Sequence, residues 1–267
     1  MNKNTGLAVI TGASSGIGAV YAARLAARGH RLLLVARRPD RLASLQAELS
    51  RAHGVEVQTL VADLERPEDV LNVEARLAAG DLALLVNNAG AGALGKSADV
   101  SADQLERIIK LNITALTRLS HAALASFRQR GTGALVNIGS VVAHQPSAGG
   151  AVYSASKAYV LNFTRSLQLE YAGSPLRIQL VMPGPIRTEF FSSQGMSDTV
   201  FPAKVWLTAE QLVDAALAGL DAGEGVTVPS LPDVRTWDDL ETARAAFMTA
   251  IMSGQVAPRY AAERPGP

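Results

Sequence analysis

The stretch Leu7 to Arg28 constrains the fold more than any other part of the sequence. An apolar run, Leu7-Ala8-Val9-Ile10, leads into Thr11-Gly12-Ala13-Ser14-Ser15-Gly16-Ile17-Gly18, and an alanine-rich segment follows to Arg28. This order predicts a strand, a glycine turn and a helix. Gly12 and Gly16 accept backbone angles that a Cβ atom disfavours, and Gly18 allows the helix to start close to the sheet or to a ligand.

The predicted helix start is suited to a pyrophosphate, because its free N–H groups and the helix dipole attract anions. The spacing G-x-x-x-G-x-G differs from the standard G-x-G-x-x-G dinucleotide fingerprint. No Gly-Lys-Ser/Thr follows it, which disfavours a nucleoside triphosphate loop. A tight strand-to-helix connection without a ligand is the alternative.

Composition limits the class of protein. The chain has 267 residues, 48% of them hydrophobic and 5% aromatic, which is enough for one large aliphatic core. The net charge of +1 gives no reason to expect nucleic acid or a membrane surface as a partner. The absence of cysteine excludes disulfides and thiolate metal sites, and we assign no metal site. The first apolar run ends in the glycine turn, so we read it as a strand, not a signal peptide, and expect a cytoplasmic protein.

Apolar strands alternate with amphipathic helices along the chain, which predicts a doubly wound parallel α/β sheet, the Rossmann fold, with about seven strands and helices on both faces. We expect a single domain over residues 1–267, with a substrate-loop region at 188–210 and a C-terminal extension at 231–267. Strands are expected at Leu7 to Ile10, Arg31 to Ala36, Val55 to Ala62, Asp81 to Val86, Gly133 to Ser140, Leu176 to Met182 and Val226 to Val228. The principal helices are expected at Ala19 to Arg28, Pro39 to Ala52, Glu68 to Ala79, Ala102 to Arg128, Val152 to Tyr171, Thr208 to Leu220 and Thr236 to Ser253.

The end of the second predicted strand indicates the preferred cofactor. A dinucleotide fold that prefers NAD carries an acidic side chain there, whereas this chain has Ala36-Arg37-Arg38. Arginine pairs with a 2′-phosphate, so the sequence favours NADP over NAD. An exposed basic corner is the alternative. Asp63 follows the third strand and is a candidate for the adenine amino group, or else for a helix N-cap.

Tyr153 and Lys157 are four residues apart in a predicted helix and therefore project from one face. A neighbouring cation stabilises a phenolate, so we expect Lys157, with a cofactor's nicotinamide ring, to lower the pKa of Tyr153. Taken alone, this spacing is more often structural, with a half-buried tyrosine and a snorkelling lysine. Ser140 ends the fifth strand and Asn112 lies in the preceding helix, at the edge where such folds bind ligands.

These motifs together resemble the short-chain dehydrogenase/reductase family, in its compact, single-domain, NADP-preferring branch. The matching residues are Thr11 to Gly18, Asp63-Leu64, Asn87-Asn88-Ala89-Gly90, Asn112, Ser140, Tyr153 with Lys157, and Pro183-Gly184-Pro185-Ile186-Arg187-Thr188. They occur in the family's order between Leu7 and Thr188. Gly139 departs from the pattern, since many members have a second serine there.

The resemblance implies a role for each residue. Tyr153 would exchange a proton with the substrate oxygen, Ser140 would hydrogen-bond that oxygen, Lys157 would bind the nicotinamide ribose, and Asn112 would hold a water on a proton path. Asn88 would lie near the ribose, and Asn87 would brace the sheet. The backbone of Ile186 and the side chain of Thr188 would fix the carboxamide. The expected cofactor-binding set is Gly12, Ser14, Ser15, Gly16, Ile17, Gly18, Arg37, Arg38, Asp63, Leu64, Asn88, Ala89, Gly90, Tyr153, Lys157, Pro183, Gly184, Ile186 and Thr188.

The expected substrate-binding residues are Ser140, Val142, Tyr153 and Phe190. Further apolar residues are candidates either for a pocket or for core: Ala93, Leu94, Phe191, Met196, Phe201 and Trp206. The segment Glu189 to Leu207 has no clear period and is expected to be a lid or binding segment.

We therefore expect an enzyme that transfers hydride between NADP(H) and a carbonyl or secondary alcohol. A 3-oxoacyl-carrier-protein reductase is an alternative, which Lys96, Arg187 and Lys204 support weakly. A non-catalytic NADP-binding sensor or partner protein is the alternative from another class. The helix Val152 to Tyr171 is apolar around much of its circumference, so we expect a homodimer or homotetramer packed through it and the Ala102 to Arg128 helix.

Overall fold

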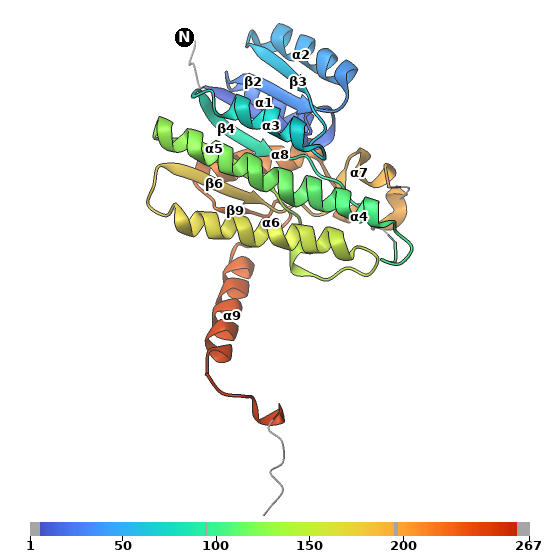
Figure 1. Ribbon diagram of the computed structural model, residues 1–267, viewed down its shortest axis with the longest axis vertical. Coiled ribbons are helices and arrows are strands. Elements are labelled where there is room, and N and C mark those ends of the chain that lie inside the picture. Colours follow the sequence, from blue (N-terminus) through green and yellow to red (C-terminus); the bar gives the residue numbers. More distant parts are fainter. Residues whose placement is uncertain (1–5, 94, 195–196, 261–267) are drawn as a thin grey trace, which may run out of the picture. The chain divides into compact units, whose positions relative to one another are not determined.

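Seven parallel strands form one sheet in the order β3-β2-β1-β4-β5-β6-β9 (Figure 1). The computed structural model describes residues 6–93, 95–194 and 197–260. The strands are β1 (Leu7–Thr11), β2 (Arg31–Ala36), β3 (Val57–Val61), β4 (Leu82–Asn87), β5 (Gly133–Ile138), β6 (Leu176–Val181) and β9 (Val226–Thr227). The doubly wound parallel sheet predicted from the sequence is confirmed.

Helices cover both faces of this sheet, and Figure 1 views it from the side of α3, α5 and α6. These three helices are α3 (Pro67–Leu77), α5 (Leu116–Arg130) and α6 (Ala151–Glu170). The opposite face packs on α1 (Gly16–Ala27), α2 (Pro39–His53) and α8 (Ala209–Ala222). Alternate residues of β1 divide between the two cores: Ala8 and Ile10 pack towards α1, whereas Leu7 and Val9 pack towards α5. Continuous apolar strands are therefore buried on both sides, as a parallel sheet requires.

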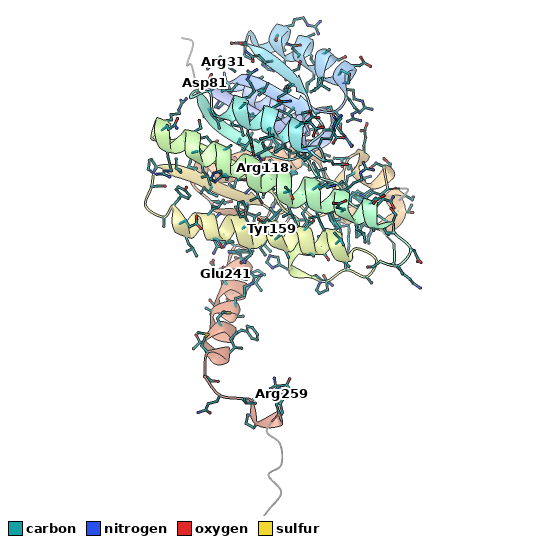
Figure 2. All side chains as sticks on the ribbon, in the orientation of Figure 1. Arg31, Asp81, Arg118, Tyr159, Glu241 and Arg259 are labelled. Atoms are coloured by element: carbon teal, nitrogen blue, oxygen red, sulfur yellow. The ribbon has the colours of Figure 1, made fainter. Side chains whose placement is uncertain are left out.

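The strand order reverses between β1 and β4, and this reversal locates the ligand crevice at the carboxyl ends of the strands. The glycine turn follows β1, Asn88 follows β4, and Ser140 follows β5, so all three lie at this edge. At the opposite edge Arg31, which begins β2, pairs with Asp81 at 2.6 Å (Figure 2).

The long helix predicted from Ala102 is interrupted. It consists of α4 (Ala102–Ile109), a π-helical segment over Lys110–Ala115, and α5. A capping box begins this helix, since Ser101 accepts a hydrogen bond from the backbone N–H of Gln104 at 3.3 Å. Single π turns inside helices are frequent at functional sites, and this one contains Asn112.

The segment after Thr188 is more ordered than its lack of period indicated. It contains α7 (Glu189–Ser192) and ends in β8 (Leu207–Thr208), which pairs with β7 (Ile186–Arg187) as a second, two-stranded sheet. The segment therefore returns to the strand from which it started.

The chain divides into two compact units, one up to Ser230 and one from Leu231. The second unit contains α9 (Arg235–Ile251), which has no buried residue among those described. The single domain over 1–267 stays a prediction. Across the described ranges, each helix is too short or too polar to cross a lipid bilayer.

Candidate active site

The glycine turn leaves no room for side chains. Gly12 and Gly16 have φ angles of +65° and +53°, in the left-handed region. A Cβ atom on Gly18 would collide with the carbonyl oxygen of Gly12. The glycines therefore let the turn pack closely against the end of β4 and against its own backbone, as the sequence predicts for a tight strand-to-helix turn.

Asn88 ties the turn to the end of β4. Its Nδ2 donates to the carbonyl oxygen of Thr11 at 2.9 Å, and the Thr11 hydroxyl accepts from the backbone N–H groups of Asn88 and Ala89, both at 3.0 Å. Asn87 donates to Ser120 at 2.9 Å and to Asn137 at 3.0 Å in the interior. These contacts show that Asn88 holds the crevice in shape and that Asn87 braces the sheet.

Arg38, rather than Arg37, reaches the glycine turn. Its guanidinium donates to the hydroxyl of Ser14 at 3.0 and 3.1 Å and to that of Ser15 at 2.6 Å. Arg37 instead donates to Glu65 at 3.4 Å. The structure therefore joins Arg38, Ser14 and Ser15 into one polar corner suited to an anion.

The residues after β3 have local structural roles. Oδ1 of Asp63 accepts from the backbone N–H of Glu65 at 3.2 Å, so its side chain stabilises the turn before α3. The N-cap of α3 is Arg66, so the alternative of Asp63 as its N-cap is wrong. Leu64 is buried in a core, which leaves its backbone for any cofactor contact.

The segment after β6 lies against the glycine turn. A Cβ atom on Gly16 would lie 3.1 Å from the Cγ2 methyl of Thr188, so the two residues are neighbours across the crevice. The Thr188 hydroxyl accepts from the backbone N–H of Phe190 at 3.3 Å and caps α7. Pro183 and Gly184 follow β6, and Ile186 is buried in β7.

Tyr153, Lys157 and Ser140 meet at the carboxyl end of β5. Lys157 is buried, its Nζ donates to the carbonyl oxygen of Ile138 at 2.9 Å, and it lies 5.9 Å from the ring centroid of Tyr153. The Ser140 hydroxyl donates to the carbonyl oxygen of Pro183 at 3.5 Å and accepts from the backbone N–H of Val142 at 3.3 Å, and it lies near enough to the Tyr153 phenol to influence its pKa. The predicted cluster is thus assembled from α6 and the end of β5.

Asn112 supports this cluster from the π-helical segment. Its side chain exchanges two hydrogen bonds of 2.9 Å with the backbone of Ala91 and donates to Ser156 at 3.0 Å. Ser156 in turn donates to the carbonyl oxygen of Tyr153 at 2.7 Å. The side chain of Asn112 is therefore engaged in positioning α6, and its water-holding role stays a prediction.

Burial dominates the electrostatics of the site. It raises the pKa of Tyr153 to about 12, and the nearby Ser140 hydroxyl offsets this in part. Burial also lowers the pKa of Lys157 to about 8. Desolvation is the largest influence on the pKa of Tyr153, and the expectation that Lys157, together with a cofactor's nicotinamide ring, lowers this pKa stays a prediction. A phenol of this kind is protonated at neutral pH and is a proton donor.

Phe190 forms a wall beside Tyr153. The two ring centroids are 5.6 Å apart, and a Cβ atom on Gly92 would lie 3.0 Å from the Phe190 ring. Phe191, Phe201 and Trp206 instead pack edge to face on one another, with centroids 4.9 to 5.8 Å apart. These three residues form a small core that shapes the segment. Leu94 and Met196 lie outside the described residues.

Gly139 has little room for a side chain, which accounts for the absence here of the second serine that the resemblance led us to expect. A Cβ atom there would lie 2.9 Å from the buried Leu180 side chain and 3.3 Å from the carbonyl oxygen of Val181. We expect Gly139→Ser to destabilise the fold by about 1–3 kcal/mol through overpacking. Urea unfolding measures this loss. A urea midpoint of Gly139→Ser equal to that of the wild-type chain would contradict the close packing at Gly139. The double variant Gly139→Ser/Leu180→Val is expected to be more stable than Gly139→Ser.

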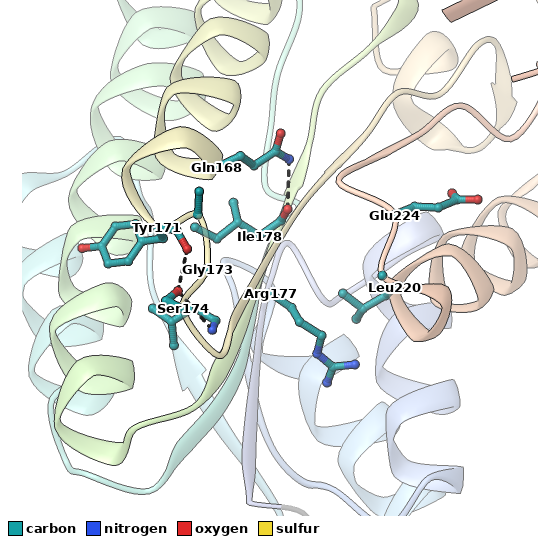
Figure 3. Close-up of a pocket in the computed structure, with 11 residues that line it drawn as sticks. Gln168, Tyr171, Gly173, Ser174, Arg177, Ile178, Leu220 and Glu224 are labelled. Carbon is teal, nitrogen blue, oxygen red and sulfur yellow. Dashed lines mark hydrogen bonds between the residues drawn. The ribbon is translucent and has the colours of Figure 1, made fainter. Parts of the chain in front are cut away.

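A separate pocket lies at the amino end of β6, away from this edge of the sheet (Figure 3). It has a volume of about 210 Å³, and its lining includes Gln168, Arg177 and Glu224. It shares no residue with the site at the carboxyl ends of the strands, and we assign it no role.

Two residues that contact the site were not singled out in the sequence. Ser156 bonds Asn112, and a serine between Tyr153 and Lys157 carries little signal by itself. Glu189 accepts from Arg38 at 2.9 Å and from Arg41 at 2.6 Å. Its signal was its position directly after Thr188.

A glycine-rich turn at the strand-order reversal, together with a half-buried tyrosine beside a buried lysine and serine, defines a dinucleotide-dependent oxidoreductase site. The sequence model described as short chain dehydrogenase matches residues 6–198. The chain belongs to the short-chain dehydrogenase family.

Individual relatives cover most of the chain. Sulfoacetaldehyde reductase 2 from Chromohalobacter salexigens is 37% identical over 217 residues, 78% of this chain and 85% of that protein. A short-chain dehydrogenase from Sphingobium yanoikuyae, solved in complex with NADPH, is 46% identical with a TM-score of 0.91, covering 96% of this chain and 100% of that one. A bulky-bulky ketone specific alcohol dehydrogenase from Comamonas testosteroni is 39% identical with a TM-score of 0.88, covering 97% and 100%.

Proposed function

We propose that this chain reduces a ketone or aldehyde to an alcohol with NADPH as hydride donor, and that it catalyses the reverse reaction when alcohol and NADP⁺ are supplied. The observation that carries this proposal is the cluster at the ligand edge of the sheet, where the half-buried Tyr153 lies 5.9 Å from the Nζ of Lys157 and close to the Ser140 hydroxyl. The similar protein solved with NADPH supports the choice of cofactor.

The residues present fit a dinucleotide. The glycine turn leads directly into the N-terminus of α1, whose first turn carries no acidic residue and no side-chain cap, and Arg38 with Ser14 provides donors suited to a 2′-phosphate. Lys157 would hold the nicotinamide ribose, and Thr188 would fix the carboxamide. When bound, the nicotinamide ring supplies or accepts the hydride.

The chain's own residues handle the proton. The substrate oxygen would lie between the hydroxyls of Ser140 and Tyr153, and Tyr153 would donate its proton as negative charge develops there. Asn112 and Ser156 keep α6 in position. Phe190 and Val142 favour an apolar substituent on the carbonyl, which agrees with the ketone named for the similar alcohol dehydrogenase. The guanidinium of Arg187 lies 5.5 Å from the Trp206 ring centroid, and the carrier-protein alternative stays open to the activity test.

Oxidation of NADPH over a panel of aldehydes, small ketones, bulky aryl ketones and 3-oxoacyl thioesters tests the activity. We expect turnover that is highest with a bulky apolar ketone and higher with NADPH than with NADH. Tight NADPH binding without turnover on the whole panel would instead favour the sensor.

We further propose a homodimer or homotetramer. Tyr159 and Leu169 lie on an exposed stripe of α6, and Leu169 is 79% exposed. The Tyr159 hydroxyl bonds Thr117 of α5 at 2.8 Å, so the two helices present one surface (Figure 2). Light scattering that finds a monomer at micromolar concentration would contradict this.

Replacing Arg38 tests the proposal that its guanidinium binds the 2′-phosphate of NADPH. We expect Arg38→Ala to raise the Kd for NADPH about 10- to 100-fold, the value of a charge-assisted hydrogen bond, and to change the Kd for NADH far less. Arg37→Ala is the matched control with a smaller effect, because Arg37 pairs with Glu65. Fluorescence titration measures both. Equal losses for NADPH and NADH in Arg38→Ala would contradict the assignment.

A further inference from the structure

Glu189 forms ion pairs with two arginines, Arg38 of the polar corner and Arg41 of α2. Its carboxylate accepts from Arg38 at 2.9 Å and from Arg41 at 2.6 Å, while Arg38 also donates to Ser14 and Ser15. The side chains of Arg38, Arg41 and Glu189 are 41%, 49% and 52% exposed, so their ion pairs lie in reach of solvent. Half-exposed ion pairs exchange partners at little cost.

Glu189 also belongs to the substrate side of the site. It is the first residue of α7 and directly follows Thr188. The next residue, Phe190, lies against Tyr153, and Gln194 lies close to Gly92. The Glu189 carboxylate therefore links the polar corner to α7, which carries Phe190 beside Tyr153.

We propose that Glu189 is a specificity-determining residue: in the cofactor-free chain its carboxylate occupies Arg38 and Arg41 in the place of the 2′-phosphate of NADPH, which must displace it, whereas NADH need not. The inference rests on the proposed function, in which Arg38 binds that phosphate. When the 2′-phosphate displaces the Glu189 carboxylate from the arginines, the start of α7 loses these ion pairs. Binding of the adenosine half of the cofactor therefore makes Phe190, beside Tyr153, more mobile.

The chemistry of the two anions supports an exchange. A carboxylate offers two oxygens to the guanidinium forks, whereas a phosphate offers three oxygens and more charge. The guanidiniums of Arg41 and Arg38 hold the pKa of Glu189 at about 2, so the carboxylate is charged throughout the neutral range. The charged Glu189 carboxylate therefore competes with the 2′-phosphate throughout the neutral pH range, and this competition lowers the apparent affinity for NADPH.

Calorimetric titration with NADPH, NADH and adenosine 2′,5′-bisphosphate tests the competition. We expect Glu189→Gln to bind NADPH and the bisphosphate about 2- to 5-fold more tightly, which is the value of one exposed ion pair, and NADH unchanged. Glu48→Gln on α2 is the matched control, because it removes an exposed carboxylate from the same neighbourhood. Unchanged NADPH affinity, or an equal change for NADPH and NADH, overturns the proposal.

Hydrogen exchange of the wild-type chain tests the link to α7. Adenosine 2′,5′-bisphosphate fills the cofactor's adenosine half alone, and we expect it to speed amide exchange at residues 190–194, whereas adenosine 5′-phosphate does not. Exchange that is unchanged or slowed by the bisphosphate overturns the link. Failure of the proposed function is distinguishable, because wild-type chain would then bind NADPH no better than NADH, and Arg38→Ala would not alter the ratio.

Discussion

Tyr153→Phe is expected to lower kcat for carbonyl reduction about 10²- to 10⁴-fold, the contribution of a positioned general acid. The substitution removes the phenol proton and keeps the ring, which packs against Phe190 with centroids 5.6 Å apart. Affinity for NADPH is therefore expected to persist. Steady-state turnover and fluorescence titration measure the two effects separately.

Tyr159→Phe is the matched control for this prediction. Tyr159 lies on the same helix, but its hydroxyl bonds Thr117 on the surface. We expect its turnover to stay near that of the wild-type chain. Full turnover in Tyr153→Phe would show that another group delivers the proton.

The pH dependence follows from the same phenol. Burial raises the pKa of Tyr153 to about 12, so the donor form needed for reduction is present across the neutral range. Oxidation of an alcohol needs the phenolate and is expected to rise with pH.

Lys157→Met is expected to have the second large effect, on stability as well as on turnover. Burial lowers the pKa of Lys157 from its ordinary 10.5 to about 8. Between these values the unfolded chain binds more protons than the folded chain, so this group makes the fold more stable as pH rises. From pH 7.5 to 9.5 the gain is about 2 kcal/mol, by the conversion of about 1.4 kcal/mol for each pKa unit.

Urea unfolding at the two pH values measures this gain as the difference between the wild-type chain and Lys157→Met. The variant is expected to lack the gain and to lose turnover. Lys110→Met, which removes an exposed lysine paired with Glu106, is expected to keep the wild-type pH dependence. Parallel pH profiles for the wild-type chain and Lys157→Met would contradict the buried charge.

The parts of the fold and site that the sequence predicts well are those set by local patterns of residues. Apolar runs and the glycine turn specify strands and a strand-to-helix connection, and the four-residue spacing places Tyr153 and Lys157 on one helical face. Residues at the carboxyl ends of parallel strands meet at one edge, which is why Ser140 was expected near them.

Features that depend on how deeply a side chain is buried, or on contacts with residues far away in the sequence, were less predictable. The pKa of Tyr153 is set by how much water the folded chain excludes, which spacing does not reveal. The pairing of Arg38 with Glu189 joins residues far apart in sequence. The π turn at Asn112 depends on its contacts with Ala91 and Ser156.

Transfer of deuterium from labelled NADPH tests the central claim most directly. The chain would be incubated separately with the two epimers of [4-²H]NADPH and a bulky ketone, and the alcohol analysed by mass spectrometry and NMR. We predict deuterium at the carbinol carbon from one epimer and none from the other, because in the proposed site Lys157 and Thr188 would hold the nicotinamide with one face towards the substrate. Alcohol without deuterium from either epimer, or with deuterium from both equally, would contradict hydride transfer in this site.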